Sequence, residues 1–185
     1  MALPDRVARR ARRRCYNQPV QGLRLPRQIE ADARCEAIRG ALAARTRKLW
    51  PGGAVEVPVL VLTDSLAAAL RAALRRGQLR RGLEAAAPAL EAERRGLAAV
   101  ARRTGRERGE RISRLCLVAS DGAERFYRQV ERCLATHAPR VLGCLLEVDG
   151  TTLGEVLYGR DTAVKLVLAD HKDAVSAILR SLARG

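Results

Sequence analysis

The sequence predicts an α/β protein, with a small basic α+β module at the N-terminus followed by a three-layer α/β/α sandwich. Two observations lead to this prediction. Residues 112–185 alternate β-rich apolar runs with amphipathic helical segments, which is typical of a small sandwich with a largely parallel sheet. Residues 1–111 contain one strand-like run among helical segments, and they carry nearly all the excess positive charge.

The charge of the chain is unevenly distributed. Residues 1–111 hold 25 Lys+Arg and 11 Asp+Glu, a balance of +14, whereas residues 112–185 hold 10 and 9, a balance of +1. A biased composition explains why arginine replaces lysine, but it does not explain this split. Because the planar guanidinium donates two hydrogen bonds to one phosphate, the first segment is expected to bind nucleic acid rather than an acidic protein or a membrane surface.

Residues 1–14 are predicted to be a basic arm that is disordered until it meets a partner. The arm contains one acidic residue, Asp5. The arginines of the arm expected to contact phosphates are Arg9, Arg10, Arg12, Arg13 and Arg14. A solvated tail without a dedicated role is the alternative.

The next elements are separated by proline and glycine. Short extended pieces are expected over residues 15–29, which contain two prolines and a glycine. A helix is predicted over residues 30–49. The turn Pro51-Gly52-Gly53 then leads into a β-branched run, residues 54–62, which is predicted to be a strand.

A second basic cluster accompanies the following helix. Thr63 or Asp64 is expected to cap it, and leucines repeat every four residues until Gly77 ends it. The arginines that fall off this apolar stripe or follow the helix are Arg71, Arg75, Arg76, Arg80 and Arg81. They are expected to contact phosphates, and a merely solvated helix face is the alternative.

Residues 84–111 are predicted to be a linker between two domains. The segment up to residue 103 is rich in Ala, Glu and Arg and contains Pro88, so a broken helix is expected. The charged, glycine-containing stretch over residues 104–111 is the expected domain boundary. The predicted organisation is therefore an arm (1–14), a basic module (15–83), a linker (84–111) and an α/β domain (112–185).

The predicted domain has a regular order of elements. Strands are expected over residues 112–119, 140–148 and 163–168, and helices over residues 124–135, 152–158 and 170–182. The first strand ends at Ser120-Asp121-Gly122. Asp121 is expected to cap the turn into the following helix, and a nucleotide-site loop is the alternative.

The sequence contains no recognisable catalytic or metal-binding arrangement. Its five cysteines form no C-x-x-C pair and its two histidines complete no ligand pattern, so no structural zinc is expected. Cys116 and Cys144 lie in apolar runs and are expected to be buried thiols. His137 is expected to cap a helix end and His171 to form a surface hydrogen bond. We therefore expect no enzymatic activity and no cofactor.

The second half resembles the ribosomal protein L7Ae/L30e family. The matching residues are LCLVASDGAER at 115–125, the strand at 140–148, and TLGEVLYGRDTAVKLVLAD at 152–170. In that family a strand ends in a small-Asp step, here Ser120-Asp121. A Leu-Gly-x-x-Leu-Gly helix then precedes a strand and a last helix. This resemblance implies the sandwich fold.

The first half resembles the bacterial YlxR family. The matching residues are Arg14-Cys15, Leu25-Pro26-Arg27, Trp50-Pro51-Gly52-Gly53-Ala54 and the helix DSLAAALRAALRRGQLRRGL at 64–83. Together the two resemblances cover about residues 13–183, and they imply a non-catalytic RNA-binding protein linked to transcription termination or translation.

Two other classes of function are kept as alternatives. In the first, the C-terminal domain is a protein-interaction module that binds a protein partner, and the basic half docks on an acidic partner or binds ribosomal RNA non-specifically. In the second, the protein is a small RNA-modifying enzyme in which the L7Ae-like fold serves as a substrate-binding domain. No apolar run approaches the about 18 residues of a transmembrane helix, and the N-terminus lacks the apolar segment of a signal peptide. A cytoplasmic location without membrane contact is therefore expected.

Overall fold

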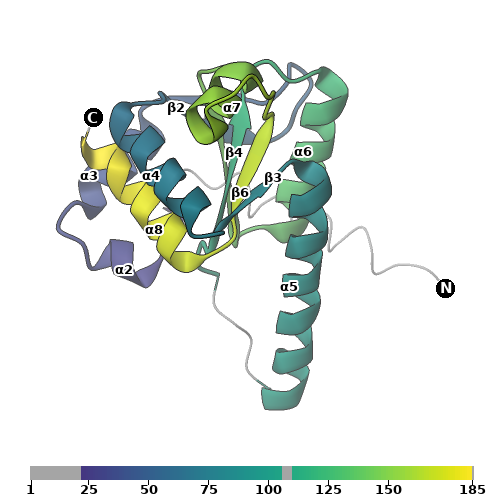
Figure 1. Ribbon diagram of the computed structural model, residues 1–185. Coiled ribbons are helices and arrows are strands. Elements are labelled where there is room, and N and C mark those ends of the chain that lie inside the picture. The colour runs from purple at the N-terminus through teal and green to yellow at the C-terminus, as the bar shows by residue number, and fades with distance from the viewer. Residues whose placement is uncertain (1–21, 106–109, 185) are drawn as a thin grey trace.

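Three parallel strands form the centre of a six-stranded sheet in the computed structural model, which describes residues 22–105 and 110–184 (Figure 1). β2 and β4 both pair in parallel with β5, while β1, β6 and β3 join in antiparallel orientation. The strands lie in the order β1 (Thr46–Lys48), β2 (Glu56–Leu60), β5 (Val141–Leu146), β4 (Arg114–Ala119), β6 (Leu166–Ala169) and β3 (Leu79–Arg81).

Helices cover both faces of this sheet (Figure 1). One face carries α2 (Arg27–Glu30), α3 (Cys35–Ala43), α4 (Asp64–Arg75), α7 (Gly150–Tyr158), α8 (Lys172–Ser181) and the 3-10 turn η2 (Leu182–Arg184). The other face carries α5 (Leu83–Thr104) and α6 (Glu124–His137). The predicted α/β class is confirmed. The prediction of a largely parallel sheet is wrong, because β6 runs antiparallel to β4.

Alternate side chains of β4 supply the two apolar layers. Leu115, Leu117 and Ala119 pack into the layer that contains α4 and α8, whereas Cys116 and Val118 pack into the layer that contains α6. This is the two-residue period of a strand that is covered on both faces. The expectation that Cys116 is buried is confirmed, and burial raises the pKa of its thiol.

Strand pairing crosses the boundary that the sequence predicts at residues 104–111. β2 pairs with β5 and β3 pairs with β6, so strands of the expected basic module lie in the sheet of the expected C-terminal domain. A two-stranded β1–β2 hairpin would be only marginally stable by itself, and it completes its pairing by joining β5. Among the described residues, the segments 22–83 and 112–184 therefore share one sheet and one apolar core.

Two helix predictions are corrected by the structure. The segment 30–49 is not one helix, because Asp32 accepts a hydrogen bond from the Arg34 backbone at 3.0 Å and closes a turn between α2 and α3. The end of that segment forms β1 instead. Conversely, α5 is continuous over Pro88. This proline lies in the second turn of the helix, where it removes only the bond to the Glu84 carbonyl.

Asp32 links the start of the described chain to its last helix. Its carboxylate accepts hydrogen bonds from Arg34 Nε at 2.9 Å and from Arg180 Nε of α8 at 2.7 Å. The Arg34 guanidinium, followed by that of Arg180, holds the pKa of this carboxyl well below its usual value of 3.8. This contact ties residues 27–34 to α8.

Stability is therefore expected to fall in acid partly through Asp32. A carboxyl whose pKa is lowered by folding stabilises the native state fully above its unfolded pKa, and this contribution is lost as the pH falls below about 4. Asp32→Asn is expected to lower stability at pH 7 and to flatten the decline between pH 4 and pH 2. Urea unfolding across this range measures both effects, and an unchanged acid decline would contradict this role of Asp32.

Candidate nucleic-acid interface

The C-terminal end of α4 presents three arginines on a rigid helix. Thr63 caps the helix by accepting a hydrogen bond from the Leu66 backbone at 3.3 Å, and Leu66 and Leu70 are fully buried. At the other end, Gly77 has φ +66° and donates to the Leu74 carbonyl, while Gln78 donates to the Ala73 carbonyl. This is a Schellman motif, which requires a left-handed residue and so favours glycine.

Arg71, Arg75 and Arg76 lie on the solvent face of this helix end. All three are exposed. Within residues 22–105 and 110–184, no side chain or backbone group forms an ion pair or hydrogen bond with their guanidinium groups. Their charges are therefore available to an anionic partner. Arg75 and Arg76, the last residue of α4 and its C-cap, also lie where cations stabilise the negative end of the helix dipole.

The other two predicted arginines of this cluster lie on edge strand β3 and already have partners. Arg80 donates from Nε to Asp170 at 2.5 Å. The Arg81 guanidinium lies 5.7 Å from the centre of the Tyr158 ring and donates to the Ala163 carbonyl at 3.3 Å. Arg80 therefore joins β3 to the end of β6, and Arg81 joins it to α7. The sequence predicts contacts for all five arginines, but the structure leaves only those of α4 unpaired among the described residues.

The arginines of the predicted arm, Arg9, Arg10, Arg12, Arg13 and Arg14, lie outside the described residues. The described chain begins close to the start of β4, because the Ile112 backbone donates to the Arg24 carbonyl at 2.8 Å. This places residue 24 at the end of the sheet where the parallel strands begin. α4 ends at the same end of the sheet (Figure 1). It leads into β3, whose first residue, Leu79, lies opposite Ala169, the last residue of the antiparallel strand β6.

At this end of the sheet, α5 adds arginines that lie in the segment predicted to be a linker. Its C-terminal half projects beyond the sheet, and no residue from Glu91 to Thr104 is buried (Figure 1). Arg95 and Arg102 are exposed and, being seven residues apart, lie on the same side of the helix. An uninterrupted helical reading of residues 83–104 would have shown this spacing. The prediction does not use this spacing, because it assigns residues 84–111 to a linker.

At the opposite end of the sheet, where the parallel strands end, the carboxylates bind other groups of the protein. Asp121, after β4, accepts a hydrogen bond from the Gly150 backbone at 2.9 Å and pairs with Lys165. It therefore helps to cap α7 rather than α6, the helix that follows it in sequence. Asp149 caps α7 through the Thr152 backbone at 2.7 Å. That hydrogen bond lowers the pKa of Asp149. Asp121 and Asp149, at the carboxyl ends of the parallel strands, thus both have partners within the protein.

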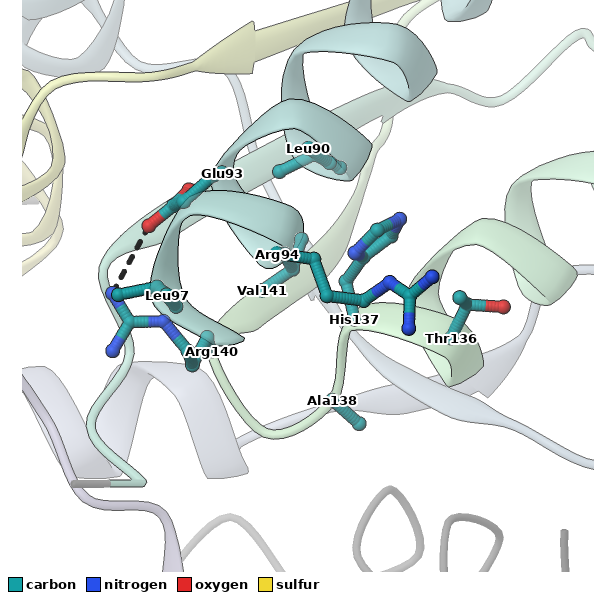
Figure 2. Close-up of a pocket in the computed structure, with 9 residues that line it drawn as sticks. All are labelled: Leu90, Glu93, Arg94, Leu97, Thr136, His137, Ala138, Arg140 and Val141. Atoms are coloured by element: carbon teal, nitrogen blue, oxygen red, sulfur yellow. Dashed lines mark hydrogen bonds and ion pairs between the residues drawn. The ribbon is translucent and has the colours of Figure 1, made fainter. Parts of the chain in front are cut away.

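A hollow of about 230 Å³ lies between α5 and the turn that joins α6 to β5 (Figure 2). His137, the last residue of α6, forms part of its wall, and burial lowers the pKa of this imidazole. His171 instead caps α8 by accepting from the Asp173 backbone at 3.3 Å, which confirms its predicted hydrogen-bonding role. In the described part of the chain no helix is long and apolar enough to cross a membrane.

No protein-family model matches the chain, and comparison with curated proteins finds no similar sequence.

Proposed function

We propose that the protein binds structured RNA without catalysing a reaction on it. The observation that carries this proposal is the group of three exposed arginines at the end of α4, Arg71, Arg75 and Arg76, which have no partner among the described residues. Phosphate groups fit such a surface, because each guanidinium can donate two hydrogen bonds to one phosphate. The basic arm would extend the contact along the nucleic acid.

The preference for RNA over DNA is part of the proposal and rests on the resemblances of the two halves to YlxR and L7Ae/L30e proteins. We propose a cytoplasmic protein that acts near transcription termination or translation. Phosphate contacts supply affinity without sequence information, so any preference among RNAs must come from the geometry of the bound strand. The same arginines could instead meet an acidic protein, and the tests below separate the two partners.

Affinity of the full chain for an RNA hairpin across a salt series tests the proposal. Each phosphate contact contributes about −0.7 to −0.9 to the slope of log Kobs against log[salt]. With three contacts from the α4 arginines alone, we expect a slope steeper than about −2. A DNA duplex of matched length is expected to bind more weakly. A slope shallower than about −1, or equal affinity for both nucleic acids, would contradict RNA binding through these arginines.

The full chain is required for this experiment. A fragment of residues 112–185 would lack β2 and β3, which pair with β5 and β6. The unpaired backbone groups of β5 and β6 would then be free to pair with strands of other chains. Loss of RNA binding by such a fragment would therefore not locate the binding residues.

A further inference from the structure

The hollow between α5 and the α6–β5 turn is lined by one face of α5. Leu90, Glu93, Arg94 and Leu97 follow the i, i+3, i+4, i+7 spacing that places side chains on one side of a helix. The opposite wall comes from the end of α6 and the start of β5. Its lining residues are Thr136, His137, Ala138, Arg140 and Val141 (Figure 2).

The walls of the hollow combine an apolar floor with fixed polar groups. Leu90 is 4% exposed and Val141 is 3% exposed, so both belong to the core. In Figure 2 the Arg94 side chain extends alongside the His137 ring toward Thr136, while Arg140 lies on the other side and reaches Glu93. Planar groups therefore line one side of a cavity that has an apolar base.

Both arginines are held by carboxylates. Arg94 donates to Glu91 from Nε at 2.9 Å and from Nη2 at 2.7 Å, and Nη1 takes no part in that pair. Glu93 accepts from Arg140 at 3.0 Å and pairs with Arg114 Nε at 3.0 Å. Because each of the two lining arginines already faces a carboxylate, the hollow is poorly suited to a free phosphate. The ion pairs instead hold the guanidinium planes in place.

The remaining chemistry suits a flat ligand that carries no charge. His137 is mostly neutral at pH 7, because burial holds its pKa below the ordinary 6.5, so the ring offers one donor and one acceptor. Thr136 adds a hydroxyl. A volume of about 230 Å³ is below the roughly 300–1,000 Å³ of pockets for drug-sized ligands, and a single heteroaromatic ring system matches this smaller size.

We propose that this hollow receives one unstacked nucleobase, which either belongs to the bound RNA or comes from a free nucleotide. One face of the base would stack against His137 and the Arg94 plane, and the other would lie against Leu90 and Leu97. Unpaired RNA bases are commonly held in this way, on aromatic rings and guanidinium planes. Where RNA is the source, the inference rests on the proposed function, since it adds a base contact to RNA binding that otherwise depends on phosphate contacts.

The position of the hollow fits this role. Ser113 and Arg114, at the start of β4, both donate their backbone N–H groups to the Arg140 carbonyl, at 2.8 and 3.1 Å. The hollow therefore lies at the end of the sheet where the parallel strands begin, on the face covered by α5 and α6, and Arg95 and Arg102 project from α5 at the same end. An RNA strand whose phosphates contact Arg95 and Arg102 would bring its bases close to the hollow, because α5 also forms one of its walls.

Titration of the full chain with AMP, GMP, CMP and UMP tests the inference, with ribose 5-phosphate as the probe that lacks a base. At least one nucleotide is expected to bind about tenfold or more tightly than ribose 5-phosphate, since stacking of one base is worth about that much. Leu97→Trp, which fills the hollow, and His137→Ala are expected to abolish this difference. His171→Ala, which removes an exposed histidine elsewhere, is the matched control and should leave it unchanged.

RNA binding by the same variants identifies the source of the base. If RNA supplies it, Leu97→Trp lowers affinity for a hairpin with one bulged base by about tenfold, while the salt slope stays the same. If nucleotides bind in the hollow but no RNA does, the inference holds for free nucleotides and the proposed function fails. Equal binding of ribose 5-phosphate, or nucleotide binding that survives Leu97→Trp, would overturn the inference while leaving phosphate-mediated RNA binding intact.

Discussion

Replacement of Gly154 by alanine is expected to destabilise the protein by about 3 kcal/mol or more, at the upper end of what overpacking a buried site costs. Gly154 is buried in α7. A Cβ at this position would lie 2.7 Å from the carbonyl carbon of Thr162 and closer still to its oxygen. The backbone of residues 162–164 cannot simply move away, because Val164 donates to the Gly150 carbonyl at 2.7 Å just before β6 begins.

Gly40→Ala is the matched control for this experiment. Gly40 also lies inside a helix, α3, but apart from its chain neighbours and the adjoining helix backbone no atom lies within 4 Å of an added Cβ. This substitution is expected to stabilise the protein by about 0.5–1 kcal/mol, because alanine favours the helix. Urea unfolding of both variants gives the two free energies. A loss below about 1 kcal/mol for Gly154→Ala would show that α7 does not pack closely on residues 162–164.

Replacing Arg71, Arg75 and Arg76 together by glutamine is expected to weaken RNA binding by about 50- to 150-fold at 0.15 M salt. The estimate assumes one phosphate for each arginine and a loss of about 0.7–0.9 in salt slope per phosphate, so the slope should become shallower by about 2 to 3. Because the three side chains are exposed, the folded structure should persist. Fluorescence anisotropy with a labelled hairpin measures both affinity and slope.

A second triple variant separates a local surface from general positive charge. Arg47 of β1 and Arg125 and Arg132 of α6 are also exposed, and they lie away from α4. Their replacement by glutamine lowers the net charge by the same amount. We expect less than about a fifth of the slope change seen with the α4 variant. Equal losses in the two variants would mean that net charge alone, rather than the α4 surface, drives binding.

Local patterns in the sequence predicted most of the elements. The strands within residues 112–119 and 140–148, the leucine repeat of α4 and its termination at Gly77 all follow from side-chain spacing and turn chemistry. β1 and β3 were missed because each has three residues and is stabilised by its partner strand rather than by its own composition. Pairing between β2 and β5, more than 80 residues apart, has no local signature in the sequence.

The candidate surface was predicted only in part. Sequence spacing placed Arg71, Arg75 and Arg76 off the apolar stripe of α4, and the structure leaves them exposed. The partners of Arg80 and Arg81 could not be foreseen, because Asp170, Tyr158 and Ala163 reach them only through the β3–β6 pairing. The hollow beside His137 was also unforeseen, since it depends on α5 continuing past Pro88 and lying against the end of α6.

Competition between a structured RNA and heparin for the full chain tests most directly whether RNA is the partner. At 0.15 M salt and equal total anionic charge, we expect the protein to stay on the RNA and heparin to displace it only at about tenfold or greater excess, since the proposed binding uses the geometry of the RNA as well as its charge. Displacement by heparin at equal charge would contradict RNA recognition and would direct the search to an acidic protein partner.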